Sequence, residues 1–295
     1  MTDGILYVAT GEEYINEAIQ SARQTRAIMD FPIALVSHRD VDADVFDEVI
    51  IDSTPQYSYV DKPRNLPRTP FDRTLFLDTD VFLVDDVSEL FDVLDHFDLA
   101  AAVDPNEAAL RLKEFEYFDS LPAGIPEYNT GVILYDKSLV ENNFFETWVS
   151  YHSDCHIHDQ PSFRKTLSVI PVRFTAISTV YNCLINWPMQ VTGEVKILHD
   201  IYGTVTQDNI SDIEGRINRS KDPRILHTGR DDVSFPLSKW GDVATRFVWY
   251  IHPVRLKRYL RRKHNLVLAF VASLKTNGVG TTFKKTWRYL RTISD

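Results

Sequence analysis

The chain has 295 residues, of which 44% are hydrophobic and 25% are charged, a composition typical of a globular protein with a substantial core rather than of a disordered chain. Its only cysteines, Cys155 and Cys183, are too few for a disulfide framework or a zinc site, so we expect ordinary thiols in a reducing compartment. The formal net charge is −10, and residues 1–245 are strongly acidic, so this body offers no basic surface wide enough for a phosphate backbone and nucleic-acid binding is not expected.

The predicted elements alternate between strands and helices along the chain. Strands are expected at 4–10, 31–38, 48–53, 74–84, 99–104, 128–136, 195–200 and 224–228, and helices at 12–29, 88–97 and 138–152. Strands separated by helices indicate parallel pairing, so the pattern predicts an α/β protein with a mostly parallel central sheet flanked by helices.

No segment has the pattern of a signal peptide or a membrane span. The start of the chain, MTDGILYVATGEEY, holds an acid at position 3 and only a short apolar run. The longest apolar run, LVLAFVASL at 266–274, is about half of the ~20 residues that a spanning helix needs. We therefore expect a cytoplasmic protein.

Two aspartates interrupt the apolar run TLFLDTDVFLV at 74–84. Asp78 follows the apolar residues of a predicted strand, and ligand sites of open parallel sheets form at the carboxyl ends of strands. Asp80 is expected on the same side, since alternate residues of an extended chain share a face. Two carboxylates this close repel each other unless a cation lies between them, and Mg²⁺ or Mn²⁺ with oxygen ligands is the natural choice. The alternative is a turn or a helix cap.

The segment FDRTLFLDTDVFLVDDVSELFD resembles the metal-binding segment of GT-A-fold glycosyltransferases, most closely the retaining enzymes of glycosyltransferase family 8, such as glycogenin and bacterial lipopolysaccharide galactosyltransferases. Three later stretches match in the expected order: YNTGVILYD (128–136), HDQPSF (158–163) and VKILHDIYG (195–203). The family's Lys-Pro-Trp after the histidine is absent. The resemblance covers roughly residues 4–203 and implies a GT-A nucleotide-diphospho-sugar transferase fold.

The resemblance also assigns roles to individual residues. It implies a metal site of Asp78, Asp80 and His199, with the metal-bound diphosphate beside Asp78. His227 follows the same Ile-Leu lead-in and remains an alternative to His199. Asp159 would hold sugar hydroxyls and the Gln160 amide would lie under the anomeric carbon. The alternative is a helix cap with Pro161 in the first turn, and both roles can hold together because a capped helix start also fixes the two side chains.

The donor nucleotide would be bound by residues from several loops. Thr10, Gly11 and Tyr14 follow the first strand and open the first helix, whose N-terminus favours anions. Asp52 ends the third strand and would receive the base or ribose, while Arg64 or Lys62 would neutralise the diphosphate. Asn129 would hydrogen-bond the donor and Gly131 would permit its close approach. Ordinary turns and a solvated basic loop are the alternatives.

The last 50 residues differ in charge from the rest. Residues 246–295 contain twelve Lys or Arg and one acid, a net charge of +11, which leaves −21 for residues 1–245. Apolar and basic residues recur at helical spacing over 255–274 and 283–291, a pattern typical of helices lying on an anionic membrane surface. Packing against the acidic body is the alternative. We therefore divide the chain into a catalytic domain, 1–240, and a basic amphipathic helical extension, 241–295.

The sequence thus predicts a metal-dependent glycosyltransferase with Mn²⁺ or Mg²⁺ as cofactor. It would move a hexose from a nucleotide diphosphate sugar, UDP-linked, to a glycan, lipid-linked or protein acceptor, with retention. Its expected place is the cytoplasm, with peripheral attachment at the cytoplasmic face of a membrane. A haloacid-dehalogenase-type phosphohydrolase and a sugar-binding GT-A module without turnover are the competing hypotheses.

Overall fold

The computed structural model describes residues 1–105, 121, 124–152, 158–185, 189–200, 203–226 and 235–236. Cys155, His227 and the predicted extension 241–295 lie outside these residues, so the division into two domains stays a prediction. Within the described part no helix is long and apolar enough to cross a membrane.

The helices and strands follow the predicted order closely. In chain order they are β1 (Asp3–Ala9), α1 (Glu12–Ile28), β2 (Ile33–Ser37), β3 (Glu48–Ile51), α2 (Asp61–Asn65), η1 (Leu66–Arg68), β4 (Arg73–Leu77), β5 (Val81–Leu83), η2 (Ser88–Asp95), β6 (Leu99–Val103), β7 (Tyr128–Asp136), α3 (Ser138–Glu141), α4 (Phe144–His152), α5 (Gln160–Val169), β8 (Phe174–Ile177), η5 (Thr179–Tyr181), β9 (Cys183–Leu184), β10 (Met189–Val191), β11 (Ile197–His199), α6 (Ile210–Ile217), β12 (Arg224–Leu226) and β13 (Phe235–Pro236), where η marks a 3₁₀ helix.

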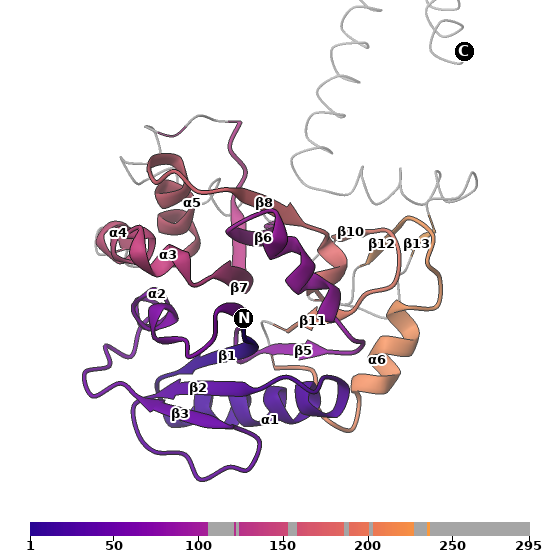
Figure 1. Cartoon of the computed structure of the whole chain (residues 1–295). Helices are drawn as coiled ribbons and strands as arrows, with labels where there is room; N and C mark the ends of the chain where they lie inside the picture. The colour runs from indigo at the N-terminus through magenta and orange to yellow at the C-terminus, as the bar shows by residue number, and fades with distance from the viewer. Residues whose placement is uncertain are drawn as a thin grey trace, which may run out of the picture. The chain divides into compact units, whose positions relative to one another are not determined.

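The central sheet has seven strands in the order β3-β2-β1-β4-β7-β6-β8. The pairs β1–β2, β1–β4, β2–β3 and β6–β8 are parallel, whereas β7 runs antiparallel to both β4 and β6. The expected mostly parallel α/β sheet is confirmed (Figure 1). Because β7 is reversed, its first residues lie at the same edge of the sheet as the last residues of β4 and β6.

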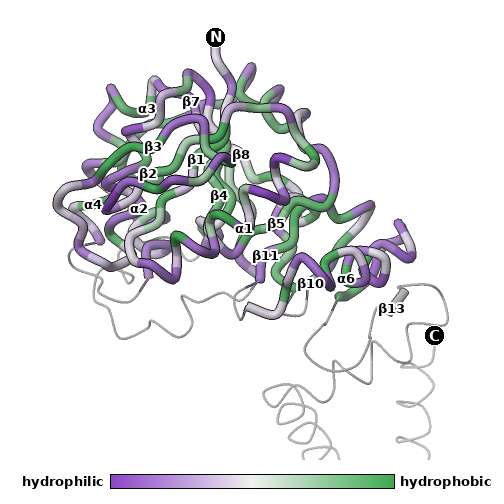
Figure 2. The backbone as a smooth tube through the Cα atoms, turned by 90° about the horizontal axis from the view of Figure 1, so that it is seen from below, coloured by the Kyte–Doolittle hydropathy of each residue, from purple (hydrophilic) through white to green (hydrophobic). Residues whose placement is uncertain are grey.

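Both faces of this sheet are covered, which explains why its strands are almost continuously apolar. One face packs against α1 and η2, in a cluster that includes Ile5, Tyr7 and Leu75. The other face packs against α4 and α5 through aromatic residues such as Trp148 and Phe163. In Figure 2 the central strands β1 and β4 accordingly form the hydrophobic interior of the trace.

Two small sheets extend the fold. Strands β5, β11 and β9 form one, in that order, and β10, β12 and β13 form the other. The hydrophobic cluster of this region also includes the apolar side of α6.

Two predicted elements are divided in the structure. The apolar run 74–84 is not one strand, because β4 ends at Leu77 and β5, in a different sheet, begins at Val81. The predicted helix 138–152 is two helices, α3 and α4, separated at Asn143, whose φ of 60° is incompatible with a continuous right-handed helix.

Candidate functional site

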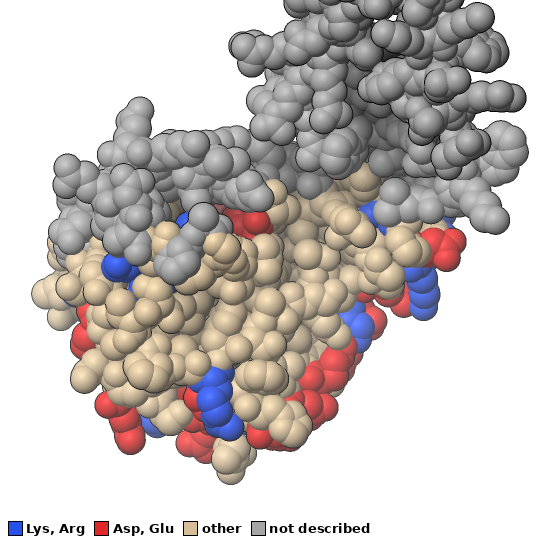
Figure 3. Space-filling view, turned by 90° about the horizontal axis from the view of Figure 1, so that it is seen from above, with Lys and Arg blue, Asp and Glu red and all other residues tan. Residues whose placement is uncertain are grey.

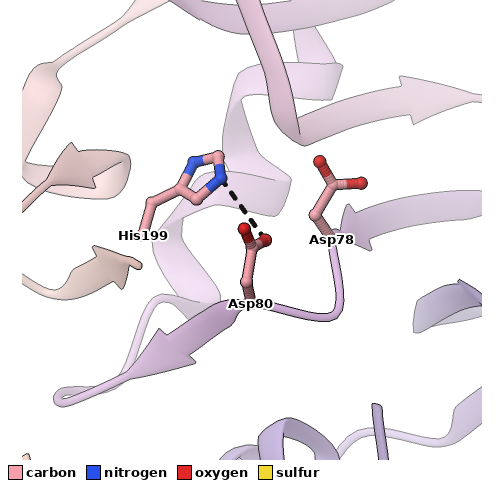
Figure 4. Close-up of side chains that lie close together, drawn as sticks. All are labelled: Asp78, Asp80 and His199. Carbon is pink, nitrogen blue, oxygen red and sulfur yellow. Dashed lines mark ion pairs between the residues drawn. The ribbon is translucent and has the colours of Figure 1, made fainter. Parts of the chain in front are cut away.

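Two carboxylates and one imidazole converge at the carboxyl end of β4. Asp78 directly follows β4, Asp80 directly precedes β5, and His199 is the last residue of β11. The strands β11 and β5 are antiparallel with His199 opposite Val81, which places the imidazole beside Asp80. One ligand atom from each of the three residues lies within 4.8 Å of the others, and His199 Nε2 is 3.4 Å from Asp80 Oδ1 (Figure 4).

A turn, not the expected extended chain, brings the two aspartates to one side. The Val81 amide donates to the Asp78 carbonyl over 3.2 Å, which closes a turn between β4 and β5. Neighbouring strands hold this turn in place, since the Asp78 amide donates to Gly131 O at 2.8 Å and the Asp200 amide donates to Asp80 O at 2.9 Å.

The pKa values within the group reflect its burial and crowding. Burial, together with repulsion from Asp80 and Asp159, raises the pKa of Asp78 to about 6, although the Lys62 ammonium opposes this shift. Burial also favours neutral His199, but the Asp80 carboxylate outweighs it and raises the imidazole pKa above its ordinary value. For Asp80 burial would raise the pKa, and His199 lowers it overall.

This donor set fits a divalent cation. Carboxylate oxygens suit Mg²⁺ and Mn²⁺, and an imidazole nitrogen beside them favours Mn²⁺. The raised pKa of Asp78 shows that the folded chain accommodates its negative charge poorly. A cation among the three side chains would offset that cost.

Lys62 links the metal group to the start of α5. Its ammonium lies 2.9 Å from Asp78 Oδ2 and 3.1 Å from Asp159 Oδ2. Asp159 is the N-cap residue of α5 by position, but its side chain makes no capping hydrogen bond. The carboxylate instead accepts a hydrogen bond from Thr130 Oγ1 at 2.8 Å. The side chain of Asp159 therefore faces the site and not its own helix.

Gln160 is held from the opposite side by Asp104, the residue after β6. Gln160 Nε2 donates to Asp104 Oδ2 over 2.6 Å. A carboxylate only accepts hydrogen bonds, so the amide nitrogen faces Asp104 and the amide oxygen faces away from it.

Asn129 and Gly131 lie at the start of β7, against His199. Asn129 Oδ1 accepts a hydrogen bond from the Gly131 amide at 2.9 Å. A Cβ atom at position 131 would lie 2.3 Å from His199 Cε1, so glycine is required by the imidazole itself. This steric reason differs from the close approach of a donor that the sequence suggested.

The residues expected at the nucleotide lie in a neighbouring network. Thr10 Oγ1 donates to Asp61 Oδ2 at 2.8 Å, and Arg64 Nη1 lies 3.2 Å from Asp61 Oδ1. Arg64 thereby ties α2 to the carbonyl of Thr54, and Lys62, also on α2, is the basic residue of this helix that contacts Asp78. Asp52 accepts hydrogen bonds from Asn65 Nδ2 and the Thr54 amide, each at 3.0 Å.

Gly11 and Tyr14 open α1 at the same edge of the sheet. Gly11 has a φ of 116°, a conformation that other residues adopt only with strain, and its amide donates to His38 Nδ1 at 3.2 Å. Tyr14 is 53% exposed. Both therefore remain predicted contacts of the donor.

Sequence reasoning did not identify Asp104, Thr130 or Asn182 as site residues. Asp104 comes directly after the apolar residues of a predicted strand, as Asp78 does, so the same rule about strand ends could have found it. Asn182 follows a short 3₁₀ helix with no local pattern that distinguishes it.

Comparison with solved structures identifies the fold. No model of a known protein family matches the sequence, and no curated protein matches it significantly. The galactosyltransferase LgtC, solved in complex with donor and acceptor sugar analogs, matches with a TM-score of 0.53 and 15% identity over 74% of this chain and 94% of that one. Mouse xyloside xylosyltransferase 1, in its apo form, matches with a TM-score of 0.50 and 16% identity over 70% of this chain and 100% of that one. The expected GT-A glycosyltransferase fold is therefore confirmed.

Proposed function

We propose that the protein is a metal-dependent glycosyltransferase that moves a hexose from a nucleotide diphosphate sugar to an acceptor hydroxyl. The observation that carries this proposal is the convergence of Asp78, Asp80 and His199 within 4.8 Å at the carboxyl end of β4, in a fold shared with LgtC. A divalent cation bound there would neutralise the donor diphosphate and the charge that develops on the leaving group.

The chain's own residues supply the remaining parts of the reaction. Lys62 places a second positive charge next to the metal group, 2.9 Å from Asp78. Asp159 lies on the other side of that ammonium, where its carboxylate would accept hydrogen bonds from sugar hydroxyls. Gln160 would direct its amide oxygen toward the anomeric carbon, since its nitrogen is held by Asp104. A polar, uncharged group under that carbon suits a reaction with retention.

For the acceptor we propose a hydroxyl of a glycan, of a lipid-linked acceptor or of a protein. The names of the two similar enzymes support a sugar acceptor: one binds an acceptor sugar analog, and the other is a xylosyltransferase acting on a xyloside. A UDP-linked donor and a location in the cytoplasm, at the inner face of a membrane, complete the proposal.

The test is a screen of UDP-, GDP- and ADP-hexoses for release of free nucleotide, with Mn²⁺, with Mg²⁺ and with a chelator. We expect at least one donor to be turned over only with a divalent ion. Asp80→Asn should lower this activity by roughly 100-fold or more, because it removes a charged metal ligand. Asp92→Asn is the matched control, because it removes the same charge at an exposed position on η2, and it should leave the turnover unchanged.

Histidine variants sharpen this test. His199→Ala should raise the Mn²⁺ concentration required for turnover, whereas His227→Ala should not. Turnover that survives both the chelator and Asp80→Asn would refute the metal-dependent mechanism. Donor binding without any turnover would support the sugar-binding module instead.

A further inference from the structure

A row of hydrogen bonds leads from His199 through the buried side-chain amides of Asn182 and Asn129 to the backbone amide of Gly131. His199 Nδ1 lies 2.9 Å from Asn182 Oδ1, and Asn182 Nδ2 donates to Asn129 Oδ1 at 2.8 Å. The Gly131 amide donates to the same Asn129 oxygen at 2.9 Å. His199, Asn182 and Asn129 are 5%, 1% and 5% exposed, so all three side chains are shielded from bulk solvent.

The backbone amide of Gly131, at the end away from His199, determines which group donates in every hydrogen bond of this row. The Gly131 amide can only donate, so the Asn129 atom facing it is the oxygen. That oxygen requires a donor from Asn182, which turns the Asn182 amide nitrogen toward Asn129 and its oxygen toward His199. An amide oxygen can only accept, so His199 Nδ1 carries a proton.

Asp104 supports the same direction from a second side. Asn129 Nδ2 faces Asp104 Oδ2 at 3.5 Å, the contact expected when the Asn129 oxygen points the other way. Asp104 also holds Gln160, so it connects this row of hydrogen bonds to the side chain proposed to face the anomeric carbon.

The consequence concerns the other imidazole nitrogen. A neutral imidazole with its proton on Nδ1 presents a lone pair on Nε2, which here lies 3.4 Å from Asp80 Oδ1. The glycine at position 131 leaves the space that the ring occupies, since a Cβ there would lie 2.3 Å from His199 Cε1.

We propose that Asn182 and Asn129, anchored by the Gly131 amide, form a positioning relay that keeps the proton of His199 on Nδ1 and reserves Nε2 for a divalent cation. The relay rests on the metal site of the proposed function but not on the identity of donor or acceptor. Asn182 acts through His199 and is a positioning residue.

Two substitutions at position 182 separate the relay from a general packing role. Asn182→Asp keeps an acceptor for Nδ1–H and so preserves the tautomer, although it loses the bond to Asn129. Asn182→Leu has a similar size but offers no acceptor. A relay predicts that Asn182→Asp binds Mn²⁺ at least as tightly as the wild type, and that Asn182→Leu binds it roughly 10–100-fold more weakly.

Asn218→Leu is the matched control. Asn218, the residue after α6, makes two hydrogen bonds of similar length, to the Val195 amide and carbonyl at 2.8 and 2.9 Å, and its oxygen also accepts from Arg224 Nη2 at 3.4 Å. Its replacement should lower the stability and leave Mn²⁺ affinity unchanged. Mn²⁺ affinity is measured by electron paramagnetic resonance titration of the full chain, after circular dichroism has shown each variant to be folded.

A second readout observes the tautomer itself. In metal-free protein labelled with ¹⁵N-histidine, at a pH at which His199 is neutral, the ring nitrogens of a protonated and an unprotonated site have distinct chemical shifts. The wild type and Asn182→Asp should show protonated Nδ1, and Asn182→Leu should gain the Nε2–H form. The His199 signals are identified by their loss in His199→Gln.

The outcomes distinguish the two proposals. Wild-type affinity in Asn182→Leu, or an Nε2–H tautomer in the wild type, overturns the relay even if sugar transfer is found. Mn²⁺ binding that follows the predicted order, with no turnover of any donor, supports the relay and overturns the proposed enzyme. A wild type that binds no Mn²⁺ overturns both.

Discussion

The metal-free fold tolerates the negative charge of Asp78 poorly. Its pKa is raised from the ordinary 3.8 to about 6, chiefly by burial and despite the nearby Lys62. Between these two values the folded protein binds a proton that the unfolded chain does not. The stability therefore falls as the pH rises through about 6, which is the opposite of the usual behaviour of a paired carboxylate.

Removing the charge should reverse this effect. In the presence of a chelator we expect Asp78→Asn to be more stable than the wild type by roughly 1–3 kcal/mol at about pH 8, because a shift of one pKa unit corresponds to about 1.4 kcal/mol. The difference should vanish below about pH 4, where the Asp78 carboxyl is protonated in both states. Urea denaturation at several pH values measures it.

The exposed Asp92→Asn provides the baseline for a change of equal charge. A stability difference for Asp78→Asn that does not vary with pH would contradict the assigned cause. Saturating Mn²⁺ should also remove the advantage of the variant, since it binds the wild-type carboxylate group and stabilises the fold by mass action.

At the scale of single elements, the residues of the site were easier to predict than their arrangement. The aspartates were visible because they interrupt an apolar strand. Their proximity to His199, however, depends on the pairing of β5 with β11, strands more than 100 residues apart. No local pattern encodes that pairing, and only the order of motifs in the resembling family indicated it.

The pattern of apolar residues also did not predict that β4 ends at Leu77. Apolar residues on both sides of Asp78 and Asp80 read as one strand, while the chain in fact turns into another sheet. The reversed β7 had a similar effect. Asn129 and Gly131 lie at the start of β7, beside the metal group. The rule for parallel sheets places ligand sites at the carboxyl ends of strands and therefore does not predict residues at the start of one.

The junction of α3 and α4 shows the same limit and allows a test. Asn143 is exposed and has a φ of 60°, a conformation that asparagine and glycine adopt far more readily than alanine. We expect Asn143→Ala to lower the unfolding free energy by about 1 kcal/mol and Asn143→Gly to change it little. Chemical denaturation measures both. Equal effects of the two variants would show that side-chain contacts, not backbone strain, decide the junction.

On the scale of the whole molecule, the dominant feature is the separation of charge. Residues 1–245 carry a net charge of −21 and residues 246–295 carry +11. Figure 3 shows acidic side chains gathered along one edge of the described body. Such a body would be repelled by an anionic membrane, so membrane attachment would depend on the basic segment alone.

This argument leads to a prediction about the tail, which lies outside the described residues. Full-length protein should sediment with anionic vesicles at low salt and not with neutral ones. Apolar residues such as Leu260 and Trp287 would enter the interface, and each nearby basic residue would add roughly 1 kcal/mol, weakened by salt. A chain ending at Pro253 should stay folded, keep donor hydrolysis and lose the sedimentation.

The opposite result is also informative. The basic tail could instead pack against the acidic part of the same chain and pair its charges there. If the full-length protein ignores anionic vesicles, or if the chain ending at Pro253 aggregates, the basic segment packs as part of the fold. The repulsion between an acidic body and an anionic surface would then be uncompensated. The acceptor would have to be sought among soluble glycans and glycoproteins, since nothing else in the charge distribution favours a lipid-linked one.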